Sequence, residues 1–325
     1  VGCAIFEASH LPGRPFGGRE LACEESLANR LRISAISYLN TAPLVWGFTE
    51  GSGRGRFDLS FTIPSLCADE LRHGKADVGL LPSIEYQLIP DLVIVPDIAI
   101  AAKEEVRSIV LVSRKPVTEI RCVALDQSSR TSVALLKILF RKYYRVEPEY
   151  VSAAPDVDAM LAIADAALVI GDPALKFPSP RAVGTERPER KPEDGSRYLF
   201  DLASEWRRWT GHAFVFAFWA GRAEVITAEV VRAFQESKRE GLAHLEDICS
   251  QESLRLGMTR EEVRRYLTEN VDFSFDEENR RGLECFYRLA EDTGLIKEVR
   301  PLRFAGLPGK PTLLEARAFP SGREA

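Results

Sequence analysis

Histidine and paired cysteines are scarce in this sequence of 325 residues. It has four histidines, at positions 10, 73, 212 and 244, and six cysteines, none of them in a CxxC pair. Histidine and cysteine show no shared ligand spacing, which argues against a zinc site. We therefore expect no metal ion, and we also expect no cofactor.

An excess of positive charge and a long apolar run are also missing. Lys and Arg number 43 against 48 Asp and Glu, for a net charge of −5. Such a chain has no electrostatic attraction for nucleic acid or for an anionic membrane. No run of about 18 apolar residues is present, so we expect no transmembrane helix.

The cysteines and the N-terminal stretch bear on location. Scattered thiols without a disulfide framework suit a reducing cytoplasm, where we expect the protein. Residues 1–30 contain no apolar stretch of signal-peptide length, and we interpret them as a poorly ordered extension. The C-terminal tail, 300–325, is rich in Pro, Gly and Arg and reads the same way.

Four hydroxyl side chains crowd one predicted strand-to-helix turn. Ser128, Ser129, Thr131 and Ser132 lie between an apolar run and a helical run. One hydroxyl suffices to cap a helix. The others, beside free backbone N–H groups and the positive end of the helix dipole, favour a site for a carboxylate or phosphate. A capped helix with spare surface serines is the plainer alternative.

The order of apolar runs and helical patterns predicts two α/β units. Strands are expected near 31–36, 59–62, 76–81, 92–100, 108–112, 122–125, 149–151, 166–170 and 213–219, with helices between most of them. Two long strands, 108–113 and 213–220, would join the units, leaving a cleft between two lobes. Ligands of such sheets lie beyond the carboxyl ends of the strands. The polar turns there are 37–40, 82–85, 128–132 and 171–172, and we expect them to converge.

Read together, these turns resemble the chorismate dehydratase family of menaquinone biosynthesis by the futalosine route. The matching stretches are 37–44, 77–86, 125–132, 170–175, 201–206, 210–217 and 282–287. The resemblance implies an α/β, two-lobed, periplasmic-binding-protein-like (type II) fold with a ligand cleft. It implies a first lobe of 31–113 plus 219–299 and a second lobe of 114–218.

The resemblance also implies a reaction, the removal of water from chorismate to give 3-[(1-carboxyvinyl)oxy]benzoate. Chorismate carries two carboxylates and a leaving hydroxyl, so a site needs two anion seats and an amide or hydroxyl partner. We predict Asn40 as the catalytic residue, because an amide both donates and accepts hydrogen bonds. The predicted substrate-binding residues are Ser37, Tyr38, Ser83, Ile84, Ser128, Ser129, Thr131, Ser132 and Asp172.

The general base stays open at this point. Glu85 and Asp172 are the only acids in the four turns, and each has a structural alternative at a helix start. The enolpyruvyl carboxylate of the substrate could instead take the ring proton. Arg130 either pairs with a carboxylate or faces solvent.

Two other functions fit parts of the sequence. A solute-binding protein for a small carboxylate would use the same fold and hydroxyl cluster, although the unpaired cysteines and the lack of a secretory signal argue against it. The sister enzyme, 1,4-dihydroxy-6-naphthoate synthase, should need a histidine in the cleft, and only His212 lies near a strand between the lobes. A homodimer is a further possibility.

Overall fold

The computed structural model describes residues 30–178 and 197–306. The predicted extension at 1–29, most of the polar loop after 178 and the end of the predicted tail, 307–325, lie outside the described residues.

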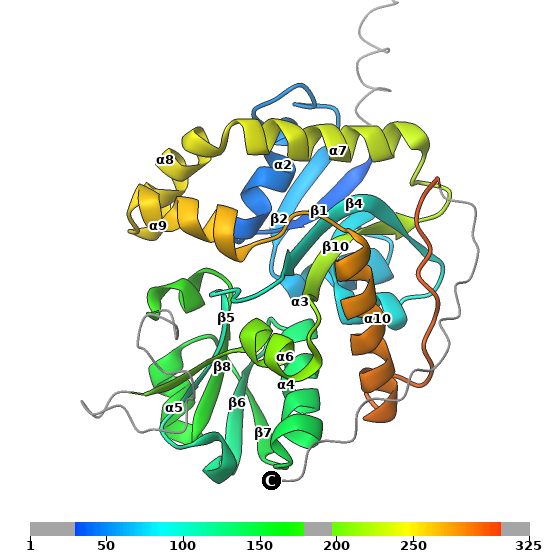
Figure 1. Ribbon diagram of the computed structural model, residues 1–325. Coiled ribbons are helices and arrows are strands. Elements are labelled where there is room, and N and C mark those ends of the chain that lie inside the picture. The colour runs from blue at the N-terminus through cyan, green and yellow to red at the C-terminus, as the bar shows by residue number, and fades with distance from the viewer. Residues whose placement is uncertain (1–29, 179–196, 307–325) are drawn as a thin grey trace, which may run out of the picture.

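Two five-stranded sheets form the centres of two lobes, one above the other in Figure 1. The first sheet has the order β2-β1-β3-β10-β4 and the second has the order β7-β6-β8-β5-β9. The first sheet contains β1 (Arg32–Ile36), β2 (Asp58–Thr62), β3 (Val78–Pro82), β4 (Leu92–Ala102) and β10 (Phe214–Arg222). The second contains β5 (Ile109–Ser113), β6 (Cys122–Asp126), β7 (Glu149–Ala153), β8 (Ala166–Ile170) and β9 (Tyr198–Asp201).

Strand direction follows the same plan in both lobes. β1 runs parallel to β2 and β3, and β6 runs parallel to β7 and β8. β10 is antiparallel to β3 and β4, and β5 is antiparallel to β8 and β9. The carboxyl ends of the parallel strands in each lobe therefore carry the polar turns that the sequence singled out.

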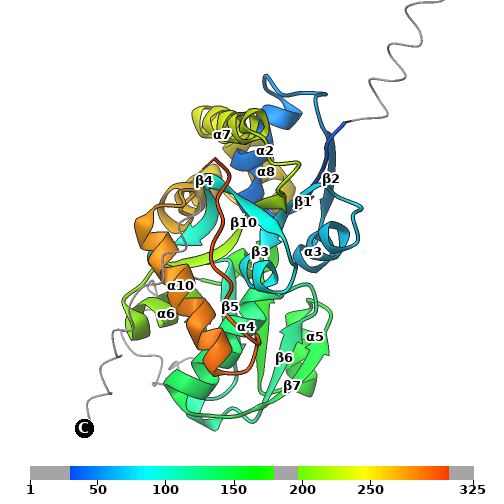
Figure 2. The ribbon, with the colours of Figure 1, turned by 90° about the vertical axis from the view of Figure 1, so that its right-hand side faces the viewer.

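Helices cover the two sheets. The first lobe has α2 (Ala42–Thr49), α3 (Pro64–Arg72), α7 (Ala228–Ala243), α8 (Leu245–Leu256) and α9 (Arg260–Arg265). The second has α4 (Thr131–Ile138), α5 (Val157–Ile163) and α6 (Leu202–Thr210). Helix α10 (Glu277–Asp292) lies along one side of the molecule beside both lobes, as Figure 2 shows, and contacts both β10 and α4.

Short helical turns fill several connections. They are η1 (Leu39–Thr41), η2 (Ser83–Gln87), η3 (Val117–Glu119), η4 (Leu139–Tyr144), η5 (Asp172–Lys176) and η7 (Tyr266–Asn270). η4 and η7 are π-helical continuations of α4 and α9.

Local residue chemistry explains why the helices begin and pack where they do. Proline stands in the first turn of α2 and of α3, where its missing N–H costs nothing. Gly241 lets α7 approach α2, because a Cβ there would lie 2.0 Å from the carbonyl oxygen of Pro43. This close contact fixes α7 over the start of α2 in the first lobe.

The chain crosses between the lobes at different places from those expected. β5 pairs within the second sheet, and the first half of β10 pairs within the first sheet. The crossings are therefore the short connections 103–108 and 211–213. Hydrogen-bonded pairing decides sheet membership, and a strand's own sequence does not reveal its partner.

Other differences from the sequence interpretation are local. β9 is not among the predicted strands, and the segment that follows β10 forms two helices, α7 and α8, divided at His244. Residues 300–306 are not a free tail. The backbone N–H of Arg300 donates to Gln87 at 2.7 Å, and Phe304 forms a bridge with Ile94 of β4.

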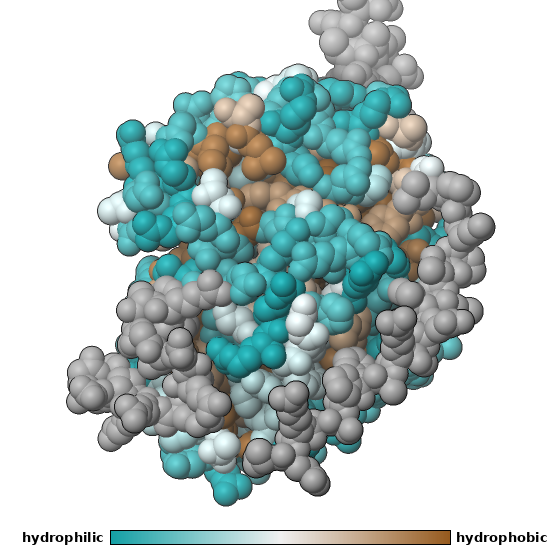
Figure 3. All heavy atoms as spheres, in the orientation of Figure 1, coloured by the Kyte–Doolittle hydropathy of each residue, from teal (hydrophilic) through white to brown (hydrophobic). Residues whose placement is uncertain are grey.

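Aromatic packing joins α6, β10 and α10. Trp206 of α6, Phe214 of β10 and Phe286 of α10 contact one another with ring centroids 4.9 to 6.3 Å apart. All three side chains are fully buried. On the face shown in Figure 3, hydrophilic residues dominate, and a hydrophobic patch lies on the upper lobe. The main core cluster contains buried residues of both lobes.

Candidate active site

A small cavity of about 60 Å³ lies between the lobes, where the carboxyl ends of the strands meet. Its polar lining residues are Tyr38, Asn40, Ser108, Ser129, Arg130, Thr131 and Ser132, together with the backbone of Gly171. Its apolar lining residues are Ile36, Pro64, Pro82, Ile100, Ile109, Ile170, Phe216 and Ala217. No carboxylate is among them, and Arg130 is the charged side chain that lines the cavity. The lining therefore suits a ligand that is negatively charged and partly apolar.

Hydrogen bonds join the lobes around this cavity. The backbone N–H of Ser65 donates to the carbonyl of Ser128 at 3.0 Å. The N–H of Ile84 donates to Oγ1 of Thr131 at 3.2 Å, and the N–H of Leu39 donates to Asp172 at 2.8 Å. The lobes are thus in direct contact on either side of the cavity.

Asn40 lies in η1, the turn between β1 and α2, and is 8% exposed. Its Nδ2 donates to the hydroxyl of Tyr266 at 3.0 Å. Its Oδ1 is buried and has no hydrogen-bond partner among the described residues. A buried acceptor without a partner costs about 1–3 kcal/mol. Asn40 is therefore an available acceptor in the cavity wall.

The hydroxyl cluster before α4 divides into two groups. Ser129, Thr131 and Ser132 line the cavity. Ser128 does not, because its hydroxyl donates to Asp126 at 2.7 Å and its N–H donates to the same oxygen at 2.9 Å. No side chain caps the first turn of α4, so its backbone N–H groups have no side-chain acceptor. The expected combination of hydroxyls and an open helix start is present, with three hydroxyls rather than four.

Ser37, Ser83 and Ile84 lie near the cavity without lining it. The Ser83 hydroxyl donates to the carbonyl of Val215 at 2.8 Å, and Ser37 is exposed and donates to the carbonyl of Thr62 at 3.2 Å. Ile84 contributes its backbone N–H, which holds Thr131 across the lobes. Ser83 and Ile84 thus position the wall, and Ser37 is at its margin.

Both candidate bases are engaged elsewhere. Glu85 is 2% exposed, hydrogen-bonded to Arg72, and lies 3.8 Å from Nε of Arg130. Asp172 accepts from the N–H of Leu39 and from Arg255, each at 2.8 Å. Neither carboxylate lines the cavity.

Tyr38 crosses the boundary between the lobes and covers Gly171. A Cβ on Gly171 would lie 2.5 Å from the Tyr38 ring, and the φ of +67° at this residue also favours glycine. The Tyr38 hydroxyl lies 3.5 Å from that of Ser128. Burial raises the pKa of Tyr38, so its hydroxyl stays neutral and can donate.

The interpretation of the sequence missed two polar residues of this region. Ser108, in the first crossing, lines the cavity, and Tyr266, at the start of η7, is hydrogen-bonded to Asn40. Tyr266 is 226 positions from Asn40. Its only local signal is a place in an amphipathic helical pattern, which is also typical of a core tyrosine.

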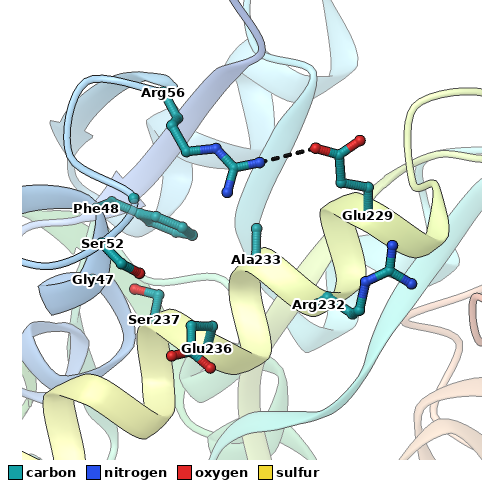
Figure 4. Close-up of a pocket in the computed structure, with 10 residues that line it drawn as sticks. Gly47, Phe48, Ser52, Arg56, Glu229, Arg232, Ala233, Glu236 and Ser237 are labelled. Carbon is teal, nitrogen blue, oxygen red and sulfur yellow. Dashed lines mark hydrogen bonds and ion pairs between the residues drawn. The ribbon is translucent and has the colours of Figure 1, made fainter.

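A second, larger hollow of about 300 Å³ lies on the first lobe between α2, the following loop and α7 (Figure 4). Arg56, Glu229, Arg232 and Glu236 surround it, and Arg56 pairs with Glu229 at 3.0 Å (Figure 4). Its charges are of both signs and largely exposed.

The described residues offer neither a metal-binding cluster nor a membrane-spanning helix. No group of three or more His, Cys, Asp or Glu there could hold a metal ion. No helix in 30–178 or 197–306 is long and apolar enough to cross a bilayer. The four described cysteines, at 67, 122, 249 and 285, are unpaired.

Two α/β lobes with two crossings and a polar cavity between them define a periplasmic-binding-protein-like fold. Protein AF1704 from Archaeoglobus fulgidus has a TM-score of 0.62 at 19% identity, covering 82% of this chain and 98% of that one. The alkanesulfonate-binding protein SsuA from Xanthomonas axonopodis pv. citri, bound to MOPS, has a TM-score of 0.55 at 15% identity, covering 82% and 94%. These likenesses confirm the predicted fold class.

Sequence comparison identifies the family. The family described as menaquinone biosynthesis matches residues 31–292. A curated chorismate dehydratase from Thermus thermophilus is 32% identical over 261 residues, which is 79% of this chain and 93% of that protein. The chain belongs to this menaquinone biosynthesis family, and the resemblance noted in the sequence is confirmed.

Proposed function

We propose that this protein is a chorismate dehydratase, a hydro-lyase that converts chorismate to 3-[(1-carboxyvinyl)oxy]benzoate in menaquinone biosynthesis. The similarity to the Thermus thermophilus enzyme, over nearly the whole of that protein, carries the proposal. The unpaired cysteines suit a cytoplasmic enzyme.

The second lobe supplies the seat for one substrate carboxylate. The uncapped start of α4, the hydroxyls of Ser129, Thr131 and Ser132, and the guanidinium of Arg130 all meet the cavity there. Backbone N–H groups at a helix start and charged donors favour a carboxylate. The turn with Ser83 and Ile84 is proposed to meet the second carboxylate when the lobes separate.

The lobes must separate before chorismate can bind. A cavity of about 60 Å³ has room for about two water molecules and not for chorismate. Substrate therefore enters between open lobes, which then close around it, as hinged two-lobed proteins do. Closure excludes water and strengthens the polar contacts to the substrate.

Asn40 holds the ring hydroxyl in place. Its Oδ1 needs a donor, and the ring hydroxyl is the donor that chorismate offers when both of its carboxylates are ionised. One N–H of the Asn40 amide is used by Tyr266, and the second can donate to the oxygen of the leaving hydroxyl group. The residue acts by orientation and by stabilising charge at the reacting centre.

The proton acceptor is proposed to be the enolpyruvyl carboxylate of the substrate. The ring C–H bond breaks, its electron pair forms the ring double bond, and the C–O bond breaks so that hydroxide leaves. The hydroxide takes up the proton held by the enolpyruvyl carboxyl group and departs as water, which restores the carboxylate. Supporting this choice, Glu85 and Asp172 are both held in ion pairs outside the cavity.

Chorismate turnover tests the function. The purified protein is mixed with chorismate, aromatic absorbance is followed, and the product is identified by mass spectrometry. Binding without turnover would favour a solute-binding protein and overturn the proposal. The sister synthase is disfavoured, because none of the described histidines, at 73, 212 and 244, lines the cavity.

Separate Glu85→Gln and Asp172→Asn variants test the choice of base. Each is expected to keep kcat within about tenfold of wild type, with losses traced to weakened contact between the lobes. A collapse of kcat in either variant with substrate affinity intact would mean that the protein supplies the base.

Association into a homodimer remains a prediction, to be checked by analytical ultracentrifugation.

A further inference from the structure

Asn40 has a buried partner in the first lobe. Tyr266 is 3% exposed, and its hydroxyl accepts from Nδ2 of Asn40 at 3.0 Å. It is the first residue of the π-helical turn η7, in which the N–H of Val271 donates to the carbonyl of Tyr266 at 3.1 Å. Such turns interrupt helices and are frequent at functional sites.

The hydrogen bond to Tyr266 sets the direction of the Asn40 carboxamide. One N–H of the amide is taken by the tyrosine, and Oδ1, on the other arm of the amide, is buried without a partner. Ser108 lines the same cavity, and its buried hydroxyl has no hydrogen-bond partner among the described residues.

We infer that Tyr266 is a positioning residue, whose buried hydroxyl holds Asn40 so that Oδ1 is presented to the ring hydroxyl of the substrate. The inference rests on the proposed function and adds a residue to it. It also explains a preference for substrates with this ring hydroxyl, since a ring without it would leave Oδ1 of Asn40 buried and unpaired. Burial raises the pKa of Tyr266 far above its usual value, so the hydroxyl stays neutral across the working pH range.

Tyr266→Phe removes the hydroxyl and keeps the ring volume. We expect kcat on chorismate to fall about tenfold to thirtyfold, with KM changed less than about threefold, because the loss is one of orientation. Tyr86→Phe is the matched control. Tyr86 is also 3% exposed, and its hydroxyl donates to Pro301 and accepts from Arg303, both at 3.0 Å, away from the cavity. Its kcat should stay within about twofold of wild type.

A double-mutant cycle separates positioning from a general structural effect. If Tyr266 acts through Asn40, then adding Tyr266→Phe to Asn40→Ala should lower kcat by less than about twofold. Additive losses would overturn the inference, and so would an unchanged single variant. If the wild-type protein did not convert chorismate, the proposed function itself would be overturned.

A structure of the wild-type protein provides a second measurement that does not depend on a variant that folds. The ligand is a saturated chorismate analogue that keeps the ring hydroxyl. We expect Nδ2 of Asn40 on the Tyr266 oxygen and Oδ1 on the ligand hydroxyl. An Asn40 side chain that leaves Tyr266 when the analogue binds would overturn the inference.

Discussion

The two hollows of this molecule differ more in chemistry than in shape. The one on the first lobe is the larger, at about 300 Å³ against about 60 Å³. Its arginine and glutamate side chains are exposed, and Arg56 pairs with Glu229, as Arg130 of the other cavity pairs with Asp69 and Glu85. The cavity between the lobes has a buried, unpartnered amide oxygen and no carboxylate. Unmet hydrogen-bonding capacity, rather than volume, therefore marks the candidate active site.

Removal of the Asn40 side chain should have the largest effect. Asn40→Ala takes away the orienting amide, and we expect kcat to fall roughly 100-fold or more. Turnover is measured with chorismate, and a thermal melt checks the fold. If the variant kept more than about a third of wild-type kcat, the unpartnered Oδ1 of Asn40 would not be needed for the reaction.

A pair of arginines compares the hollows directly. Arg130 and Arg56 are similarly exposed, with 44% and 49% of their side-chain surface accessible, but each lines a different hollow. Arg130→Ala should raise KM about tenfold, because the cavity loses its cation. Arg56→Ala should leave kcat and KM within about twofold of wild type. Equal effects in the two variants would remove the distinction between the hollows.

Glycine substitutions test the wall between the lobes. Gly171→Ala forces a methyl group against the Tyr38 ring, and we expect kcat/KM to fall about tenfold. Gly294→Ala is the control, because Gly294 has a comparable φ of +74° with nothing within 4 Å of its Cβ position. Both variants should lose stability on heating, but activity per folded molecule should fall in the first alone.

The smallest expected effect comes from one hydroxyl of the anion seat. Thr131→Val keeps the side-chain shape and removes the acceptor of the Ile84 N–H, so we expect KM to rise about fivefold. Thr293→Val is the control, since that buried hydroxyl donates to Leu289 within its own helix. A KM unchanged in Thr131→Val would mean that the backbone N–H groups of α4 bind the carboxylate without this hydroxyl.

Much of the site could be predicted because its residues follow strands. Tyr38 and Asn40 come after β1, and Ser129, Thr131 and Ser132 come after β6. Polar residues at the carboxyl ends of parallel strands meet at one edge of a sheet, so a local pattern has a known place in space. The structure brings these five side chains to the same cavity.

Other assignments depended on partners that are distant in the sequence. Ser128 was grouped with its neighbours, yet its hydroxyl donates to Asp126. Glu85 and Asp172 were open candidates for the general base, and the structure pairs them with Arg72 and Arg255. The same holds for β5 and β10, whose sheet membership depends on pairing and not on apolar content.

The alternation of strands and helices, the polar turns and the family could be predicted before folding was considered, because they depend on neighbouring residues and their order. The folded arrangement was needed to show which hydroxyls remain free, which carboxylates are neutralised and which buried tyrosine accepts from Asn40. The reason is physical: a hydrogen bond or an ion pair depends on the distance between two groups, and folding sets that distance for residues far apart along the chain.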